Sequence, residues 1–338
     1  MTELLKTLFI TTPGTSLHLD GDTVRIHHPD KPGRHILPLI RIEQLVVWRG
    51  VDVSNELMHR CADDSRGITW LSRNGRFLHR TVGPQTGNPL LRVEQVRAYD
   101  QPERRLNLAK TLVAGKIHNY RQMLLRTARD ASGSRRTTLR DLAQQHVDAL
   151  APLQESTSLD VVLGIEGRIA RSYFQTIPTL ISGARSGRAR KPPRDPVNCL
   201  LSFGYGMLRV AVLGALEHVG LDPYIGYLHG VRSGKPSLAL DLMEEFRPPL
   251  VDRLVATLFN RNQITPAHTH TDPSGAVHLT EEGRSFFLNQ WSQERERNWK
   301  HPQLDRDVPA ALLPLVQARF LARHIRGDQP NYTPWAAR

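Results

Sequence analysis

Residues 83–89 have the sequence Gly-Pro-Gln-Thr-Gly-Asn-Pro, and the hydrophobic periodicity of the chain changes across them. Before this stretch, short apolar runs alternate with turn residues, which is typical of strands. After it, apolar residues recur about every 3.6 positions, which is typical of helices. Gly- and Pro-rich stretches of this kind mark linkers. The sequence therefore predicts an α+β protein, with an N-terminal β domain over residues 1–88 and an all-α C-terminal domain over residues 89–338.

The N-terminal part is expected to contain strands joined by tight turns. Asn74-Gly75 is the strongest hairpin signal, because this pair tolerates the positive φ of a type I′ turn. One helix should interrupt the strands, since Ser54 can cap it and Leu57, Met58 and Cys61 recur at helical spacing. The first five strands are expected at residues 7–11, 16–19, 24–28, 36–39 and 44–48.

The C-terminal part is expected to be helical. Pro102 and Pro196 lie where a first helical turn accepts proline, and Asp195 can cap the second of these helices. Pro248-Pro249 should break or kink the stretch 237–262. The helices are expected near residues 91–99, 102–130, 137–150, 158–176, 195–219, 237–262, 281–299 and 309–326.

The charge of the chain indicates a polyanionic partner. Its 338 residues include 45 Lys and Arg against 33 Asp and Glu, a net charge of +12. Such an excess attracts nucleic acid at long range. Aromatic residues make up only 6%, which argues against a stacking platform for single strands and favours contacts with the backbone of duplex DNA.

The sequence also indicates the compartment. No run of eighteen apolar residues is present, so we expect no membrane span. The N-terminus lacks the basic region and cleavage site of a signal peptide, and it resembles a first strand. Cys61 and Cys199 lie in apolar helical surroundings, which predicts reduced, packed thiols and a cytoplasmic protein.

One loop, residues 182–194, concentrates positive charge. Its glycines and prolines leave it no core to join, so we expect it to be mobile and solvated. It is either a soluble linker or an arm that grips phosphates when DNA binds. The five charged residues that would contact DNA are Arg185, Arg188, Arg190, Lys191 and Arg194.

Glu166 lies in a predicted helix between two glycines, Gly164 and Gly167. Each glycine costs a helix about 1 kcal/mol relative to alanine, so something must offset the loss. The close approach of a ligand or a backbone to the face around Glu166 would do so, and helix packing explains the glycines equally well. By itself Glu166 would be an ordinary exposed or ion-paired glutamate.

A second stretch, residues 227–248, places His229 before a Gly/Ser/Lys loop and a short acidic helix. Asp241 and Glu244 are three residues apart and share a helix face, with Glu245 slightly around it. Carboxylates that border a core need partners, and a bound cation is one. The alternative is that these acids lie near a helix N-terminus, where the helix dipole stabilises negative charge, and form ion pairs with Arg247 or Arg253.

Two carboxylates and an imidazole from separate segments suit Mg²⁺ or Mn²⁺ better than structural zinc. On a basic chain, an open divalent site points to phosphodiester chemistry. Arg232 and Lys235 in the adjoining loop are placed to hold phosphate oxygens.

A histidine cluster is the rival metal site. His268, His270 and His278 lie close to Asp272, and alternate histidines on a strand would face one side. The cluster contains no cysteine, and Asp-Pro-Ser-Gly is typical of a turn. A solvated hairpin therefore explains the segment better than zinc.

Several motifs together resemble those of the CRISPR-associated integrase, the larger catalytic subunit of the spacer-acquisition complex. The likeness spans the whole chain, and the intervals of 63 and 15 residues between Glu166, His229 and Glu244 also fit. The Ser233–Pro236 loop and the C-terminal half resemble the type I-C branch. The matching stretches are Gly-Ile-Glu-Gly at 164–167 followed by Arg171, Tyr173 and Phe174; 195–198 with 201–206; Leu228-His229-Gly230; and 240–248.

The resemblance implies an N-terminal β domain used for dimerisation and a helical catalytic domain. It implies that Glu166, His229 and Glu244 are catalytic and hold Mg²⁺ or Mn²⁺, with Asp241 a further acidic ligand and Glu245 the alternative. The expected activity is integration of short DNA, in which the 3′-hydroxyls of a protospacer attack the phosphodiesters of a CRISPR repeat. DNA nicking is a side activity.

The resemblance also implies partners. Two homodimers flank a dimer of a small ferredoxin-like protein to form a heterohexamer on double-stranded DNA, and an additional processing nuclease is left open. The residues alone keep two other functions open: a non-enzymatic DNA-binding scaffold, and a junction-resolving nuclease that never integrates.

Overall fold

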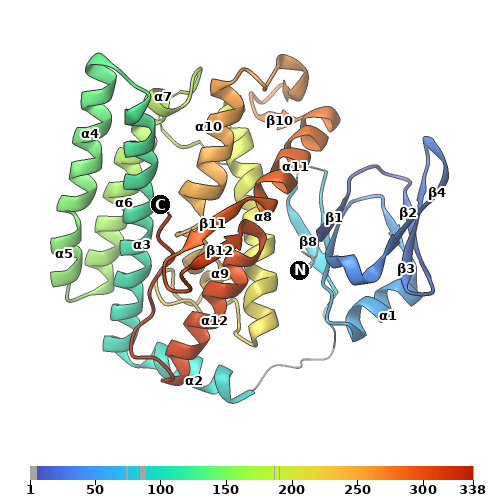
Figure 1. The fold of residues 1–338 in the computed structure, drawn as a ribbon, viewed down its shortest axis with the longest axis horizontal. Helices are drawn as coiled ribbons and strands as arrows, with labels where there is room; N and C mark the ends of the chain where they lie inside the picture. Colours follow the sequence, from blue (N-terminus) through green and yellow to red (C-terminus); the bar gives the residue numbers. More distant parts are fainter. Residues whose placement is uncertain are drawn as a thin grey trace. The chain divides into compact units, whose positions relative to one another are not determined.

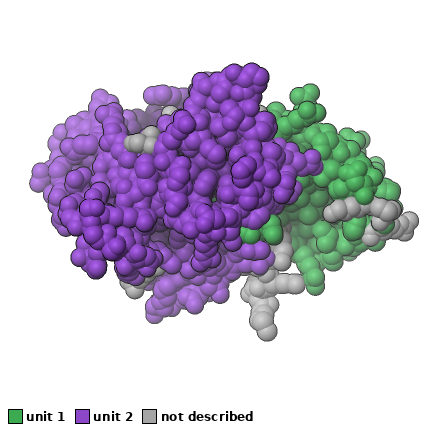
Figure 2. All heavy atoms as spheres, turned by 90° about the horizontal axis from the view of Figure 1, so that it is seen from above, with its two compact units in different colours: residues 1–86, 287–292 green, residues 87–286, 293–338 purple. Residues whose placement is uncertain are grey.

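The computed structural model describes residues 6–73, 75–81, 83, 89–185, 187–189 and 191–337. The chain divides into two compact units, residues 1–86 with 287–292 and residues 87–286 with 293–338 (Figure 2). Strands dominate the first unit and helices the second, so the α+β class is confirmed. Asn74 and most of the predicted linker, residues 84–88, lie outside the described residues.

The first unit contains two four-stranded sheets around one core. All five predicted strands are present, and so is the helix α1 (Asn55–Asp63), whose Leu57 N–H donates to the Ser54 hydroxyl at 3.3 Å. Leu17, Leu45 and Ile68 are fully buried in the core. The first sheet has the order β1 (Lys6–Ile10), β5 (Ile42–Trp48), β7 (Ile68–Leu71), β8 (Phe77–Arg80), and the second β4 (Lys31–Pro38), β3 (Thr23–His28), β2 (Ser16–Asp20), β6 (Asp52–Val53).

The second unit is built mainly from helices. The helix α3 packs against α4, α5 and α6, and these helices lie side by side in Figure 1. Asp195 caps α8 as predicted, accepting from the Asn198 N–H at 2.8 Å. The helices are α2 (Pro89–Asp100), α3 (Pro102–Arg129), α4 (Gly133–Asp148), α5 (Leu150–Glu155), α6 (Leu159–Gln175), α7 (Ile177–Leu180), α8 (Pro196–Val219), α9 (Ser237–Met243), α10 (Arg253–Asn260), α11 (Glu281–Glu296) and α12 (Leu313–Arg326).

Among the described residues, α8 is the one helix long and apolar enough to cross a membrane by length and composition. However, 61% of its apolar window is buried inside the protein. It packs against α9, α10 and α12, which is the environment of a core helix.

The interruption predicted at Pro248-Pro249 is confirmed, because the stretch 237–262 passes through a π-helical turn over Arg247–Asp252. The expectation that this unit is all-α was wrong, since it contains two short hairpins. The predicted helix 281–299 ends at Glu296, and burial then alternates through Trp299 and His301 as in a strand. The hairpins are β9 (Thr269–Thr271) with β10 (Val277–Leu279), and β11 (Asn298–His301) with β12 (Arg306–Pro309).

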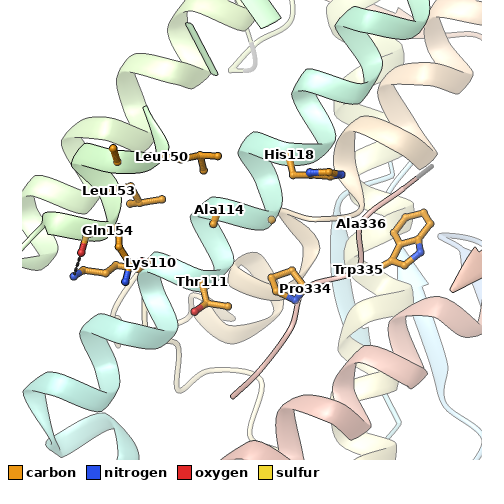
Figure 3. Close-up of a pocket in the computed structure, with 12 residues that line it drawn as sticks. Lys110, Thr111, Ala114, His118, Leu150, Leu153, Gln154, Pro334, Trp335 and Ala336 are labelled. Carbon is orange, nitrogen blue, oxygen red and sulfur yellow. Dashed lines mark hydrogen bonds between the residues drawn. The ribbon is translucent and has the colours of Figure 1, made fainter. Parts of the chain in front are cut away.

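Residues 328–337, the C-terminal segment, return along α3. Asn119 on α3 donates to the Trp335 carbonyl at 2.9 Å and accepts from the Ala337 N–H at 2.9 Å. Gly115 permits this approach, because a Cβ there would meet the Pro334 side chain at 2.5 Å. Figure 3 shows Pro334 and Trp335 beside α3, where the C-terminal segment, α3 and α5 enclose a pocket of about 570 Å³.

Candidate active site

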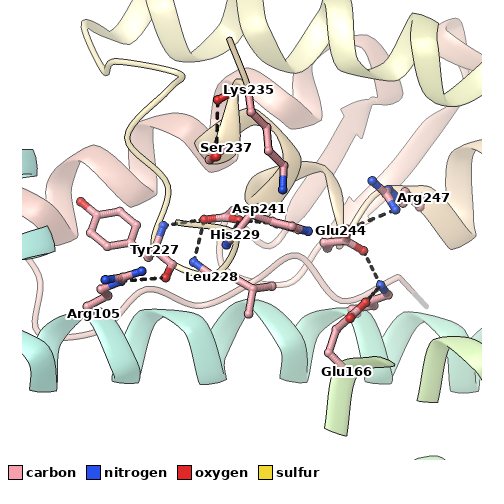
Figure 4. A network of polar contacts seen from close by, with 11 residues as sticks. Arg105, Glu166, Tyr227, Leu228, His229, Lys235, Ser237, Asp241, Glu244 and Arg247 are labelled. Atoms are coloured by element: carbon pink, nitrogen blue, oxygen red, sulfur yellow. Dashed lines mark hydrogen bonds and ion pairs between the residues drawn. The ribbon is translucent and has the colours of Figure 1, made fainter. Parts of the chain in front are cut away.

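Four segments of the helical unit meet at one group of charged side chains. Glu166 comes from α6, Lys116 from α3, His229 from the loop after α8, and Glu244 from the turn after α9 (Figure 4). The three residues predicted to be catalytic are therefore brought into one region, and a lysine that was not predicted lies among them.

Lys116 joins the two glutamates. Its side chain is buried, and its ammonium contacts Glu166 Oε1 and lies 2.7 Å from Glu244 Oε2. Glu166 is 19% exposed, whereas Glu244 is 2% exposed. One carboxylate thus faces the solvent edge of the site and the other its floor.

Positive neighbours keep Glu244 ionised. Burial acts to raise the pKa of Glu244, but Arg247 and Lys116 lower it to about 2. The Arg247 guanidinium lies 3.2 Å from Glu244 Oε1. Glu244 Oε2 is buried and lies 2.7 Å from the Lys116 ammonium. A carboxylate oxygen has a second lone pair, so this oxygen retains capacity for a further ligand.

Asp241 holds the loop that carries His229. One of its oxygens accepts from the Tyr227 and Leu228 backbone N–H groups at 2.6 and 2.9 Å. The other accepts from the His229 N–H at 3.0 Å and lies 2.7 Å from His229 Nδ1. A carboxylate on Nδ1 fixes the tautomer in which Nε2 is a free acceptor. In Figure 4 the imidazole lies between Asp241 and Glu244.

Glu245 faces the opposite way. Its carboxylate accepts from the Tyr332 hydroxyl at 2.8 Å and from the Trp335 N–H at 2.7 Å. Gln317 lies 3.3 Å from both of its oxygens. Glu245 therefore binds the C-terminal segment and leaves the acidic edge of the site to Asp241 and Glu244.

A buried polar layer backs Glu244. The Arg247 guanidinium lies 5.0 Å from the centre of the Tyr205 ring, and the Tyr205 hydroxyl donates to Asp252 Oδ1 at 2.5 Å. Burial raises the pKa of Asp252 to about 6, although the hydrogen bond from Tyr205 opposes the shift. Arg253, the other predicted partner of the acids, pairs with Glu294 instead.

The glycines beside Glu166 are not explained by packing. A Cβ at Gly164 or Gly167 would meet nothing within 4 Å among the residues that the structure describes. Close packing against another described helix therefore does not account for these glycines. The helix surface next to Glu166 is open, and this favours the approach of a ligand.

A family model described as CRISPR associated protein Cas1 matches residues 8–293 of the chain. The chain belongs to the Cas1 family. It is 41% identical to a CRISPR-associated endonuclease Cas1 of Moorella thermoacetica and 40% identical to one of Rhodospirillum rubrum, covering 99% of each chain in both cases. It is also 32% identical to a Cas4 exonuclease/Cas1 endonuclease fusion of Geobacter sulfurreducens, covering 98% of this chain and 60% of the fusion.

Solved structures agree with this assignment. A Cas1 protein from Thermotoga maritima superposes with a TM-score of 0.82 at 25% identity, covering 96% of this chain and 98% of that one. A casposase bound to integration product gives 0.84 at 21%, covering 97% and 93%. A chain of a partial Cas6-RT-Cas1–Cas2 complex gives a TM-score of 0.68 at 23% identity, covering 98% of this chain and 99% of that one. The last two, below 25% identity, are evidence for the Cas1 fold alone.

Two of the basic residues predicted to bind DNA lie in the loop of this Cas1-family site. Arg232 is exposed, and Lys235 is half-buried. Figure 4 shows the Lys235 side chain pointing toward His229 and Glu244. Lys235 N donates to Arg232 O at 3.1 Å, which closes the loop into a tight turn and keeps both residues near the site.

The loop 182–194 is attached to the helical unit, contrary to the expectation of a free, solvated arm. The Arg188 guanidinium donates to Asn198 Oδ1 at 2.7 Å and to the Ser202 hydroxyl at 2.9 Å, which ties the loop to α8. Arg194 donates to the Ser274 carbonyl. Arg185 and Lys191 are exposed, and Arg190 lies outside the described residues.

The histidine cluster forms the hairpin β9/β10. His270 and His278 are cross-strand partners, and His278 Nε2 lies 2.9 Å from Asp272 Oδ2. His268 is instead buried, with its Nδ1 accepting from the Thr265 N–H at 3.1 Å. The three histidines therefore do not face one point. Within the described ranges, no three His, Cys, Asp or Glu side chains form a preassembled group of metal ligands.

Sequence reasoning missed Lys116 and the contact between Glu245 and the C-terminal segment. A signal for Lys116 was present, because it shares the buried face of α3 with Leu112 and Tyr120 at intervals of four residues. A lysine on an apolar helix face is rarely buried without a charged partner. The sequence around Lys116 does not indicate which acidic residue is its partner.

Proposed function

We propose that the chain is a divalent-metal-dependent DNA integrase and endonuclease that inserts short DNA fragments into a CRISPR array. One observation carries the proposal. Two carboxylates and an imidazole from three separate segments lie in one region of a basic protein (Figure 4), and the two carboxylates are close enough to share the ammonium of Lys116. Membership of the Cas1 family, whose relatives are named endonucleases, supports it.

The donor set fits Mg²⁺ or Mn²⁺. Glu166, Glu244 and Nε2 of His229 would hold the ion, because hard divalent ions prefer oxygen ligands and Mn²⁺ also accepts imidazole. Asp241, expected as a fourth ligand, already accepts three backbone N–H groups and faces His229 Nδ1. We therefore assign it the positioning of His229 instead of a place on the metal.

When bound, the ion would supply a Lewis acid that polarises the target phosphate and stabilises the charge that develops in the transition state. Arg232 and Lys235 hold non-bridging oxygens of the phosphate. A 3′-hydroxyl of the incoming DNA attacks in line, so one P–O bond forms while the repeat strand leaves with its own 3′-hydroxyl. With water as the nucleophile, the same residues nick DNA.

The proposal extends to partners. The β domain forms the homodimer, and two homodimers flank a dimer of a small ferredoxin-like protein in a heterohexamer of the type I-C kind. A structural neighbour belongs to a complex with Cas2, and a relative is fused to a Cas4 exonuclease. These names support a second subunit and an associated processing nuclease for this chain. The substrates are double-stranded protospacer and repeat DNA.

Strand transfer into a repeat-bearing plasmid tests the proposal. Glu166→Ala and His229→Ala proteins should lose integration and nicking in Mn²⁺, while Asp141→Ala, an exposed carboxylate on α4, should retain both. Integration at the wild-type rate by folded Glu166 and His229 variants would instead identify a scaffold. Nicking or junction cleavage without joined products would identify a nuclease that does not integrate.

A further inference from the structure

Lys116 lies within this site, and the chemistry proposed above gives it no role. Its side chain is 3% exposed and lies on α3, with its ammonium 5.6 Å from the centre of the Tyr120 ring. A buried ammonium is unstable unless opposite charges and hydrogen bonds replace its water. Here the replacements are carboxylates of Glu166 and Glu244.

The position of the Lys116 ammonium indicates its role better than its burial does. It bridges two carboxylates that come from different elements and that are the oxygen ligands proposed above. Glu244 Oε2 is buried and lies 2.7 Å from the Lys116 ammonium, and Glu166 Oε1 contacts the same ammonium. Charge attraction contributes strongly to both contacts, so a divalent cation can compete for these oxygens.

We propose that Lys116 is a resident cation that occupies the space between Glu166 and Glu244 and competes with the divalent ion for both carboxylates. This inference rests on the metal site of the proposed function. In the metal-free protein the ammonium neutralises two carboxylates that would otherwise repel each other. Binding of a divalent ion requires the ammonium to withdraw from at least one of them.

The arrangement explains why the ligands do not form a preassembled group in the described part of the chain. The ammonium lies between two of them, so their oxygens face Lys116. Arg247, the other cation near Glu244, approaches a different oxygen, Oε1, at 3.2 Å. It can therefore remain in place when Lys116 withdraws, and Lys116 alone carries the exchange.

The test compares Mn²⁺ binding by calorimetry and thermal unfolding in EDTA and in Mn²⁺. Lys116→Met removes the competing charge and keeps the apolar stem. We expect a lower Tm in EDTA, a larger rise in Tm on adding Mn²⁺, and at least roughly tenfold tighter Mn²⁺ binding than in the wild type, because a paired buried charge is removed. Lys110→Met on the same helix is the matched control, since the Lys110 ammonium donates to the Gln154 carbonyl at 2.8 Å, away from both glutamates (Figure 3).

A second variant keeps the test decisive if Lys116→Met does not fold. Lys116→Arg retains the charge and can bind carboxylates through two N–H groups, so Mn²⁺ should bind more weakly than to the wild type. Mn²⁺ binding by Lys116→Met that is equal to or weaker than wild-type binding would overturn the inference, as would unchanged binding by Lys116→Arg.

Failure of the proposed function has a different signature. If Mn²⁺ neither binds the wild-type protein nor raises its Tm, or if Glu166→Ala binds Mn²⁺ as the wild type does, the metal site itself is wrong. If the wild type binds Mn²⁺ through Glu166, and the Lys116 variants bind Mn²⁺ as tightly as the Lys110→Met control does, the metal site is supported. The competition between Lys116 and the metal ion is then refuted.

Discussion

Asp241 Oδ1 lies 2.7 Å from His229 Nδ1, and the same carboxylate accepts the backbone N–H groups of Tyr227, Leu228 and His229. One buried side chain thus shapes the loop and orients the imidazole that the loop carries. Because all of its acceptor positions serve this purpose, Asp241 acts through His229.

Asp241→Asn should therefore impair both folding and metal binding. The amide replaces one acceptor with a donor, so at least one buried N–H is left unpaired, at about 1–3 kcal/mol of unfolding free energy. Loss of the carboxylate on Nδ1 should weaken Mn²⁺ binding roughly 10- to 100-fold. Urea unfolding in EDTA and calorimetry measure the two effects. Weaker Mn²⁺ binding with unchanged stability in EDTA would show that Asp241 is a ligand.

Gly164→Ala should separate stability from DNA binding. Alanine meets no neighbour there and suits a helix better, so the unfolding free energy should rise by about 1 kcal/mol. If DNA approaches the open surface beside Glu166, the added methyl group should weaken DNA affinity several-fold. Ser172→Ala, on the same helix, controls for helix propensity alone. An unchanged affinity would show that the glycine serves no close approach.

The exposed charges of the loop 182–194 should appear in the salt dependence of DNA binding. Replacing Arg185 and Lys191 by Gln should reduce the slope of log K against log salt by up to about 2, roughly one for each phosphate contact. Arg188→Gln should mainly lower Tm, since its guanidinium binds Asn198 and Ser202. Fluorescence anisotropy at several salt concentrations distinguishes these results. An unchanged slope in the double variant would exclude the loop from DNA contact.

Asp252→Asn should change how stability depends on pH. Burial raises the pKa of Asp252 to about 6, above the usual value of 3.8 for an aspartate, so the folded state holds the proton more tightly than the unfolded state. This group therefore stabilises the fold below about pH 4, and that contribution is lost as pH rises to about 6, by about 3 kcal/mol. Asn keeps the acceptor for Tyr205 without the charge. The variant should gain stability relative to the wild type between pH 4 and 6, and parallel urea-unfolding curves across that range would refute the shift.

Tyr332→Phe should loosen the C-terminal segment. It removes a hydroxyl that donates to Glu245 at 2.8 Å and accepts from Gln317 at 2.9 Å, both buried. The expected loss is about 1–3 kcal/mol of unfolding free energy. Tyr224→Phe, at an exposed position, is the control. Equal stability of the two variants would mean that the hydrogen bond to Glu245 contributes nothing.

Much of the fold follows from local pattern. Apolar periodicity predicted the strands and most helices, and the caps at Ser54 and Asp195 lie where residue type placed them. The errors fall where tertiary contacts override local preference. Residues 298–301 form a strand instead of extending the helix, because Trp299 and His301 are buried while the residues between and before them are exposed. Arg188 lies against the helical unit because its guanidinium donates to Asn198 on α8.

The sequence was sufficient to predict which residues belong to the site, but not which role each of them has. Motif order indicated Glu166, His229 and Glu244, but spacing on a helix cannot separate Asp241 from Glu244. The difference arises because the loop 227–229 returns over one carboxylate and not the other. Lys116 escaped prediction for a similar reason, since its partner Glu166 is 50 residues away in the chain.

Glu244 and Glu245 are adjacent residues with the same side chain, but they have different contacts: Glu244 pairs with Lys116, and Glu245 accepts a hydrogen bond from the C-terminal segment. Their duties are set by position in the turn alone. A substitution elsewhere in α9 leaves that position intact, whereas inserting or deleting one residue between Ser237 and Glu244 rotates the pair by about 100° and turns both carboxylates away from their partners. Natural variation within this stretch should therefore consist of replacements at constant length, which makes α9 a fixed reference for aligning divergent relatives.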